Sequence, residues 1–252
     1  MFPGGRKADM TNRVLLNNVD HGDLRVVLGH GPQFGDNINQ VLIFPTEFEA
    51  VQREYPIFFR KDAEGAFQSV ALLGLDRDEN LFLDQGGQLG GWNARYVPAI
   101  QQRGPFSIAV GQRSGEPMIH IDLDHPRVVA AKDQGGEPVF LPAGGNSPYL
   151  QHVARLLGVI YDGLEFSKAM FEAFEAHGLI EPIDVEIKLD EHTQYDLPDL
   201  YAISQERFAA LDAGALEALH RSGFLAVAQW ALSSLGNIGF LIELKNRRRA
   251  GV

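Results

Sequence analysis

The stretch MIHIDLDHP, residues 118 to 126, holds the side chains whose types and spacing could most readily do chemistry. His120 and Asp122 have the H-x-D form used by non-haem iron oxygenases, in which a His and a carboxylate share one strand face. A second His from elsewhere in the chain completes such a site and leaves coordination positions open for oxygen and a co-substrate. On this interpretation the protein is a metal-dependent oxygenase with Fe(II) as its cofactor.

The same stretch also fits a half-buried strand that holds no metal. Side chains alternate along a strand, so the apolar members would pack in the core and the polar members would face water. These are Ile119, Ile121 and Leu123 on one face, and His120, Asp122 and Asp124 on the other. No other His has a neighbour that marks it as a third ligand. We therefore favour the strand and keep the metal site as the alternative.

A second candidate site lies in the segment GGWNARYVPAIQQRGPF, residues 90 to 106. Trp92, Arg95, Tyr96 and Arg103 stand there among glycines and prolines, a composition that suits a loop binding a peptide or a sugar by stacking and hydrogen bonds. The competing interpretation, that the aromatic rings only cover the edge of a sheet, is the commoner outcome for such a pattern. The segment is still the first place where we expect a ligand groove.

Composition narrows the classes of function. The 252 residues carry a formal net charge of -11, which would repel a phosphate backbone, so nucleic acid is not an expected partner. The chain has no cysteine, which excludes disulfides, thiolate catalysis, zinc fingers and iron-sulfur clusters. Any metal would have to be bound by His and carboxylate side chains.

The N-terminal sequence has no continuous apolar stretch followed by a small-residue cleavage site, so it does not predict a secretory signal, and we expect a cytoplasmic protein. Glycine, proline and charge in its first residues are typical of a disordered lead-in over 1–12. The rest of the chain, 13–252, is predicted to form a single domain.

The elements that must position these residues follow from periodicity. Short apolar runs at 57–59, 69–75, 80–84 and 106–112 predict strands, and connections this short favour antiparallel pairing. Residues 106–112 are expected to form a hairpin with the strand at 118. A capping box of Thr46 and Glu49 predicts a short helix.

The period changes after residue 145. Asn146 and Ser147 can cap a long amphipathic helix that runs to Gly178, a strand follows at 183–189, and helices are expected from about Ser204. Strands first and helices second indicate an α+β fold, with a largely antiparallel sheet from the N-terminal half packed against C-terminal helices.

The segment from Gly223 to Ile242 carries no charge and is long enough to cross a bilayer at ~1.5 Å per residue. Gln229, Ser233 and Asn237 nevertheless recur every four residues and draw a polar stripe along the predicted helix. Lipid offers such a stripe no partners, so we expect a half-buried helix of the fold and no transmembrane span. The basic run KNRRR, 245–249, is expected to be its solvated end.

Several segments in order resemble the SapC family of bacterial proteins: YPIFFRK, ALLGLDRDENLFLD, WNARYVPAIQQRGPF, HIDLDHPRV, FSKAMFEAFEAHGLIEP and LHRSGFLAVAQWALSSLGNI. The resemblance covers most of the chain. The family is named after a component associated with surface-layer proteins, and members are often encoded beside outer-membrane TonB-dependent receptors. The resemblance implies a role in a surface or uptake system and brings no catalytic residues with it.

Together these observations predict a non-catalytic accessory or binding protein of a bacterial surface-protein or outer-membrane uptake system. Its partner would be a protein or peptide, and it would need no cofactor. The oxygenase built around His120 and Asp122 remains the alternative.

Overall fold

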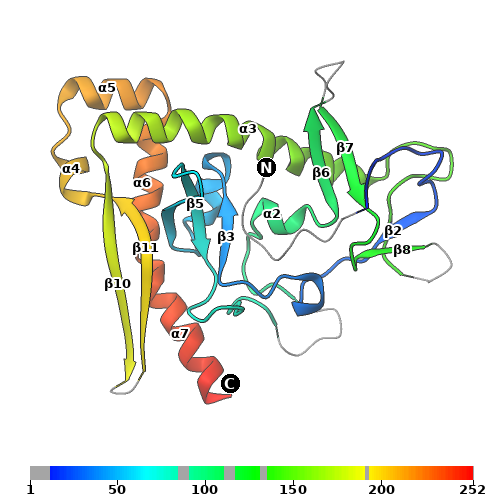
Figure 1. The fold of residues 1–252 in the computed structure, drawn as a ribbon, viewed down its shortest axis with the longest axis horizontal. Helices are drawn as coiled ribbons and strands as arrows, with labels where there is room; N and C mark the ends of the chain where they lie inside the picture. The colour runs from blue at the N-terminus through cyan, green and yellow to red at the C-terminus, as the bar shows by residue number, and fades with distance from the viewer. Residues whose placement is uncertain (1–11, 85–90, 111–116, 131–134, 191–192, 252) are drawn as a thin grey trace. The chain divides into compact units, whose positions relative to one another are not determined.

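The computed structural model of the protein describes residues 12–84, 91–110, 117–130, 135–190 and 193–251 (Figure 1). They fall into two compact units, each described here by itself. Unit 1 draws on residues 1–36, 83–92 and 99–161, and unit 2 on residues 37–82, 93–98 and 162–252. Apart from Asn12, the predicted lead-in lies outside the described residues. The single domain over 13–252 stays a prediction.

Unit 2 is built on a five-stranded antiparallel sheet in the order β10-β11-β4-β5-β3. Its strands are β3 (Gln40–Ile43), β4 (Ile57–Lys61), β5 (Phe67–Leu72), β10 (Ile180–Asp190) and β11 (Thr193–Ile203). The runs predicted at 57–59, 69–75 and 183–189 are confirmed as β4, β5 and β10.

The sequence did not reveal β11, because its pattern is interrupted. Pro198 and Asp199 fall in a register shift of the β10–β11 ladder, where Leu197 pairs with Val185 and Leu200 pairs with Ile183. A proline is tolerated at such a bulge because it has no N–H to give to the ladder. Asp199 takes a positive φ of 60° there, which breaks the alternation of the strand.

The short helix predicted near residue 46 is present as η2 (Pro45–Glu47) followed by α1 (Phe48–Val51). The predicted capping box named Glu49 as the acidic cap, but the acidic cap is Glu47. The Glu47 carboxylate accepts the Phe44 backbone N–H at 3.0 Å, whereas Glu49 is exposed and pairs with Arg53. The turn starts two residues earlier than the pattern suggested, because Phe44 is its N-cap and Pro45 supplies its first position.

The long helix is confirmed as α3 (Pro148–Ala176). Ser147 caps it by accepting the Leu150 N–H at 3.1 Å, and Gly178 follows it with a φ of 62°. The first part of α3, to Tyr161, belongs to unit 1, and the rest belongs to unit 2. In unit 2, Phe171 packs edge-on against Phe59 of β4, with ring centroids 5.1 Å apart.

Four more helices complete unit 2: α4 (Gln205–Ala209), α5 (Ala213–Arg221), α6 (Phe224–Ser234) and α7 (Asn237–Ala250). The helices begin near Ser204, as expected, and Ser204 caps α4 by accepting the Arg207 N–H. Gly223 follows α5 with a φ of 79°. The helices come mainly from the C-terminal half and every strand pair described is antiparallel, so the α+β prediction is confirmed.

The polar stripe of the C-terminal segment meets other parts of unit 2. Ser233 donates to the side-chain oxygen of Gln52 at 2.9 Å, and Asn237 donates to the backbone oxygen of Gln52 at 2.9 Å. Ser234, which lies beside the stripe, accepts the Ile57 N–H at 2.9 Å. By length and composition alone, the described stretch Phe224–Ala250 could cross a membrane, and 28% of its most apolar window is buried. The helix is interrupted at Leu235 and Gly236, between α6 and α7.

The basic run at the end of α7 was predicted to be a solvated end, but it is partly buried. Lys245 is 7% exposed and pairs with Asp76 and, at 2.7 Å, with Glu79. Burial works against its charge, but these carboxylates outweigh it and raise the pKa of Lys245 to about 12. Arg248 donates to the Asn80 carbonyl at 3.0 Å. The charged turn at Asp76–Asn80 is therefore the docking point of α7.

Unit 1 contains two small antiparallel sheets, with the orders β1-β7-β6 and β8-β2-β9. The strands are β1 (Arg13–Leu15), β2 (Leu24–Val26), β6 (Phe106–Val110), β7 (Pro117–Asp122), β8 (Val128–Ala130) and β9 (Glu137–Pro138). The predicted pairing of 106–112 with the strand at 118 is confirmed as β6–β7. The turn between them lies outside the described residues.

The run at 80–84 was predicted to be a strand, but it does not form one. It forms only one isolated bridge, between Leu83 and Trp92. Leu81, Phe82 and Leu83 are buried, so the run is apolar because it fills the core and not because it belongs to a sheet.

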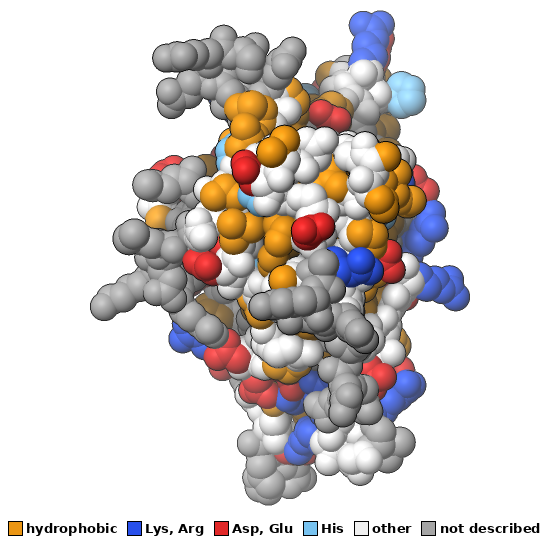
Figure 2. Space-filling model, turned by 90° about the vertical axis from the view of Figure 1, so that its right-hand side faces the viewer, with side chains coloured by type: hydrophobic (Ala, Val, Ile, Leu, Met, Phe, Trp, Pro, Cys, Tyr) orange, Lys and Arg blue, Asp and Glu red, His pale blue; other side chains and the backbone are white. Residues whose placement is uncertain are grey.

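The surface of unit 1 carries several large apolar side chains. Figure 2 looks from the right-hand side of Figure 1, where β2 and β8 lie, and shows hydrophobic side chains gathered on that face. The exposed large apolar residues of unit 1 are Leu15, Val19, Leu28 and Leu141. Val19 is the most exposed of them, at 87%.

Two glycines of α3 test how closely this helix is packed. A Cβ at Gly163 would collide with Phe44 and would lie 2.8 Å from Thr46 Oγ1, whereas a Cβ at Gly158 would meet nothing within 4 Å. We expect Gly158→Ala to raise the free energy of unfolding by up to ~1 kcal/mol, because alanine is the better helix former. Gly163→Ala should lower it by ~1–3 kcal/mol through overpacking. Urea unfolding of both variants measures the difference, and equal effects would contradict the close packing.

Candidate functional site

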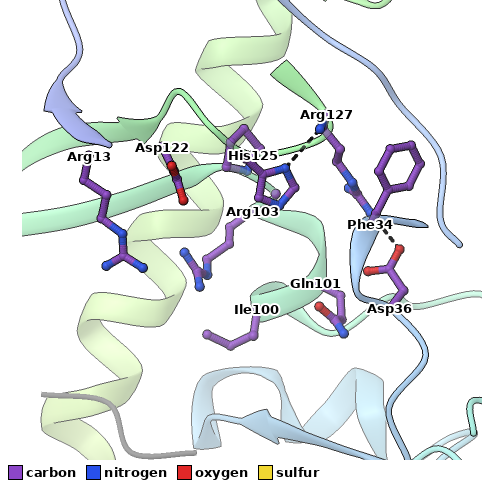
Figure 3. A pocket seen from close by; sticks show the side chains of 11 residues that line it. Arg13, Phe34, Asp36, Ile100, Gln101, Arg103, Asp122, His125 and Arg127 are labelled. Atoms are coloured by element: carbon purple, nitrogen blue, oxygen red, sulfur yellow. Dashed lines mark hydrogen bonds and ion pairs between the residues drawn. The ribbon is translucent and has the colours of Figure 1, made fainter. Parts of the chain in front are cut away.

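A cavity of about 140 Å³ in unit 1 gathers charged side chains from separate segments (Figure 3). Arg13 comes from β1, Asp122 from the end of β7, and His125 from the turn that follows β7. A short helix, α2 (Ala99–Gln102), and the 3-10 helix η1 (Pro32–Phe34) supply further walls. Arg103 and Arg127 complete the set of cations.

The best-defined interaction in the cavity is the buried ion pair of Asp36 and Arg127. Arg127 Nη2 lies 2.8 Å from Asp36 Oδ2, and the exposed fractions of the two side chains are 6% and 3%. The same carboxylate oxygen accepts the Gly31 N–H at 2.9 Å. The ring of Phe34 stacks under the Arg127 guanidinium, with 4.8 Å between its carbon and the ring centroid. Arg127 thus has its Nη2 group and one face of its guanidinium engaged, while its buried Nε has no hydrogen-bond partner among the described residues.

The pKa of Asp36 follows from its neighbours. Burial raises it, but the hydrogen bond from His30 and the positive charge of Arg127 outweigh that effect, so the pKa of Asp36 lies below its ordinary value. Asp36 is thus a carboxylate at neutral pH and neutralises Arg127.

Arg103 and Arg13 differ from Arg127 in having no carboxylate within ion-pair distance among the described residues. Arg103 Nη1 donates to the Phe106 carbonyl at 2.6 Å, and its buried Nε has no hydrogen-bond partner among the described residues. Burial and, to a lesser extent, the positive charge of Arg13 lower the pKa of Arg103. A guanidinium remains charged at neutral pH even so.

Asp122 stands opposite Arg13 in the β1–β7 register, yet the two make no ion pair. Its Oδ1 accepts the Asp124 N–H at 3.2 Å and so holds the turn after β7. In Figure 3 its carboxylate lies above the guanidinium groups of Arg13 and Arg103. Asp122 is therefore half-buried beside the cavity, and the prediction that it simply faces water was incomplete.

His125 is held in the turn by a backbone contact. The Arg127 N–H donates to His125 Nδ1 at 3.1 Å, which requires that nitrogen to be unprotonated. Burial and the positive charge of Arg127 lower the pKa of His125 below its ordinary value. The imidazole is neutral at pH 7 and adds no charge to the cavity.

Of the residues predicted for a ligand groove, only Arg103 lines this cavity. Trp92 is in unit 1 and lies edge-on to His30, with ring centroids 5.2 Å apart. Arg95 and Tyr96 are in unit 2. The structure therefore divides the four residues and does not bring them together in one described site.

Arg95 and Tyr96 have contacts of their own in unit 2. The backbone N–H groups of both donate to the Glu54 carboxylate, at 2.8 Å from Arg95 and 3.2 Å from Tyr96. The Tyr96 hydroxyl donates to Glu47 at 2.8 Å, and burial, with the charge of Glu47, raises the pKa of Tyr96. These contacts fix the loop to the η2–α1 turn.

The alternative metal pair lies on β7. His120 and Asp122 share one face of the strand, as predicted, and His120 pairs with Leu15 and Ser107 on the neighbouring strands. The buried His120 Nδ1 has no hydrogen-bond partner among the described residues. Within the same residues, no group of three His, Asp or Glu side chains is placed to hold a metal ion. A third ligand for Fe(II) is therefore not found in the described part of the chain.

Sequence reasoning missed Arg13, Asp36 and Arg127 as site residues. Arg127 follows directly after the MIHIDLDHP stretch, and Asp36 follows the glycine-rich GHGPQFG. No spacing in the sequence links the two, because they are 91 residues apart. The signal available was a charged residue beside a glycine-rich turn, which is too common to identify a site.

The lowered pKa of His125 gives a pH prediction. The unfolded chain binds a proton at this ring near pH ~6.5, before the folded chain does, so the stability that the neutral ring contributes is present above that pH and is lost below it. His125→Asn keeps an acceptor for the Arg127 N–H but cannot titrate. We expect the variant to lose less unfolding free energy than the parent between about pH 7.5 and about pH 5.5 in urea titrations. An equal or greater loss in the variant would contradict the assignment.

The chain is similar to a known protein family. A model of the family described as SapC matches residues 16–241, which include parts of both units. No curated protein and no solved structure matches the chain. The resemblance seen in the sequence is confirmed over most of its length, and the chain belongs to the SapC family.

Proposed function

We propose that the protein is a non-catalytic accessory protein of a bacterial surface-protein or outer-membrane uptake system, and that it binds a ligand in the cavity of unit 1. The observation that carries the proposal is the pair of cations, Arg13 and Arg103, which converge there without a carboxylate within ion-pair distance in the described residues. Like charges brought together cost free energy, which a bound partner of opposite charge recovers.

The kinds of side chain in the cavity suit binding. Guanidinium groups hold their charge across the physiological range and donate hydrogen bonds in a fixed planar geometry, so they recognise and orient a ligand. His125 uses Nδ1 as an acceptor inside the turn. The proposal accordingly includes no cofactor.

Membership of the SapC family supports the setting, because the resemblance implies a surface or uptake system. The gathered apolar side chains of unit 1 support a protein or peptide partner, since exposed apolar surface of this kind is commonly covered by one. A net charge of -11 makes nucleic acid an unsuitable partner.

The same proposal places the protein in the cytoplasm without a transmembrane span. Three polar groups of the C-terminal segment support this: Ser234, Asn237 and Lys245 make their hydrogen bonds to β4, to the end of α1 and to the Asp76–Asn80 turn. A bilayer would leave these groups without partners, whereas the fold satisfies them.

Deletion of the gene in its native host tests the proposed function. We expect the deletion to change the abundance of surface or outer-membrane proteins, measured by quantitative mass spectrometry, and the wild-type gene to restore it. Arg13→Gln should fail to restore it, because the cavity has lost one of its cations. Arg53→Gln removes the same charge from an exposed helical pair in unit 2 and serves as the matched control.

Two results would count against the proposal. An unchanged surface and outer-membrane protein set after deletion would exclude the accessory role. Full restoration by Arg13→Gln would show that the role does not depend on the cavity.

A further inference from the structure

The electrostatics of the cavity are unbalanced in a way that the proposed function alone does not explain. Arg127 is neutralised by Asp36 at 2.8 Å, so this pair contributes no net charge. Arg13 and Arg103 remain with Asp122 as the nearby acid, and His125 is neutral at pH 7. Two positive charges and one negative charge give these side chains a net charge of one positive unit.

The geometry also leaves hydrogen-bond donors unused. The buried Nε of Arg103 has no partner among the described residues, although Nη1 of the same group is held by the Phe106 carbonyl. A buried N–H without an acceptor costs roughly 1–3 kcal/mol, and natural proteins keep such groups rare. In Figure 3 the guanidinium groups of Arg13 and Arg103 point to the same region, below the Asp122 carboxylate.

We propose that this cavity binds a small oxyanion, whose carboxylate or phosphate group is held between Arg13 and Arg103. Such a group supplies both the negative charge and the acceptor atoms that the site lacks, and the planar guanidinium fork matches the oxygens of either group. The inference rests on the proposed function only in taking the cavity as the ligand site. It specifies the chemical class of the ligand.

The size of the cavity limits the ligand. A volume of about 140 Å³ is close to the ~150 Å³ of an engineered cavity that accommodates benzene, so the enclosed part of the ligand is a compact group. Ile100 of α2 and Phe34 of η1 give the cavity its apolar surface, while Gln101 offers an amide that can donate or accept. The one excess positive charge favours an anion with a single charge, such as a carboxylate or a phosphate monoester that carries one proton.

Thermal unfolding of the purified full chain tests the proposal. The probes are inorganic phosphate, acetate and acetamide, each titrated against sodium chloride at constant ionic strength. Acetamide has the shape of acetate without its charge, so it separates recognition of the anion from recognition of the shape. A probe that binds should raise the melting temperature by ~2–4 °C at about five times its dissociation constant.

Two variants locate the effect. Arg13→Gln should abolish the stabilisation by anions, and without any anion its melting temperature should equal or exceed that of the parent, because the repulsion of Arg103 is relieved. Asp122→Asn should strengthen anion binding severalfold, because it removes the negative charge beside the site. Arg53→Gln should respond to the anions as the parent does.

Each outcome decides the proposal. Stabilisation by phosphate or acetate, absent with acetamide and lost in Arg13→Gln, supports it, and the more effective anion identifies a phosphoryl or a carboxylate ligand. Failure of both anions to stabilise the parent overturns it. Stabilisation that persists in Arg13→Gln also overturns it. So does stabilisation that weakens in Asp122→Asn, because loss of a negative charge weakens the binding of a cation and not of an anion. The deletion experiment is independent, so an uptake role can stand while this ligand class fails.

Discussion

The buried ion pair between Asp36 and Arg127 is the constraint on which unit 1 depends. It joins the end of the η1 segment to the turn after β7, and the removal of either partner would leave a buried charge unpaired at a cost of ~3–5 kcal/mol. Because Arg127 is fixed by this pair, its backbone N–H is placed to hold His125. The pair builds one wall of the cavity and neutralises the charge of Arg127.

Unit 2 uses its charges differently. Lys245 pairs with Asp76 and Glu79, and Glu47 accepts from Phe44 and Tyr96, so the buried Lys245 and Glu47 both have partners inside the fold. The chain as a whole is acidic, which argues against extended polyanions as partners. A local excess of positive charge in one cavity is compatible with that, because short-range pairing and exclusion of water decide the binding of a small ion.

Much of the fold could be predicted from the sequence where periodicity and caps act locally. The α3 helix, with Ser147 at its start and Gly178 after its end, and the β6–β7 hairpin are of this kind. β11 was missed because Pro198 and Asp199 interrupt its alternation at a bulge. The run KNRRR was misread because burial of Lys245 depends on acids 166 and 169 residues away.

The candidate site was harder to predict than the fold, because its members are brought together only by tertiary structure. Arg103 was selected for its place in an aromatic loop, and Asp122 was selected for an H-x-D spacing. Neither pattern predicts that the two residues line one cavity together with Arg13. A spacing rule finds residues that act from one element. It cannot find cations that converge from β1 and from the end of α2.

The NMR signal of the Arg103 Nε–H group reports whether Arg13 and Arg103 bind an oxyanion. In a ¹H–¹⁵N spectrum of the full chain this buried donor should give a resonance of its own, assigned by its loss in Arg103→Lys. Inorganic phosphate or acetate should shift this resonance in a saturable manner, while acetamide should leave it in place. A resonance that neither anion moves, while the protein remains folded, would contradict the claim.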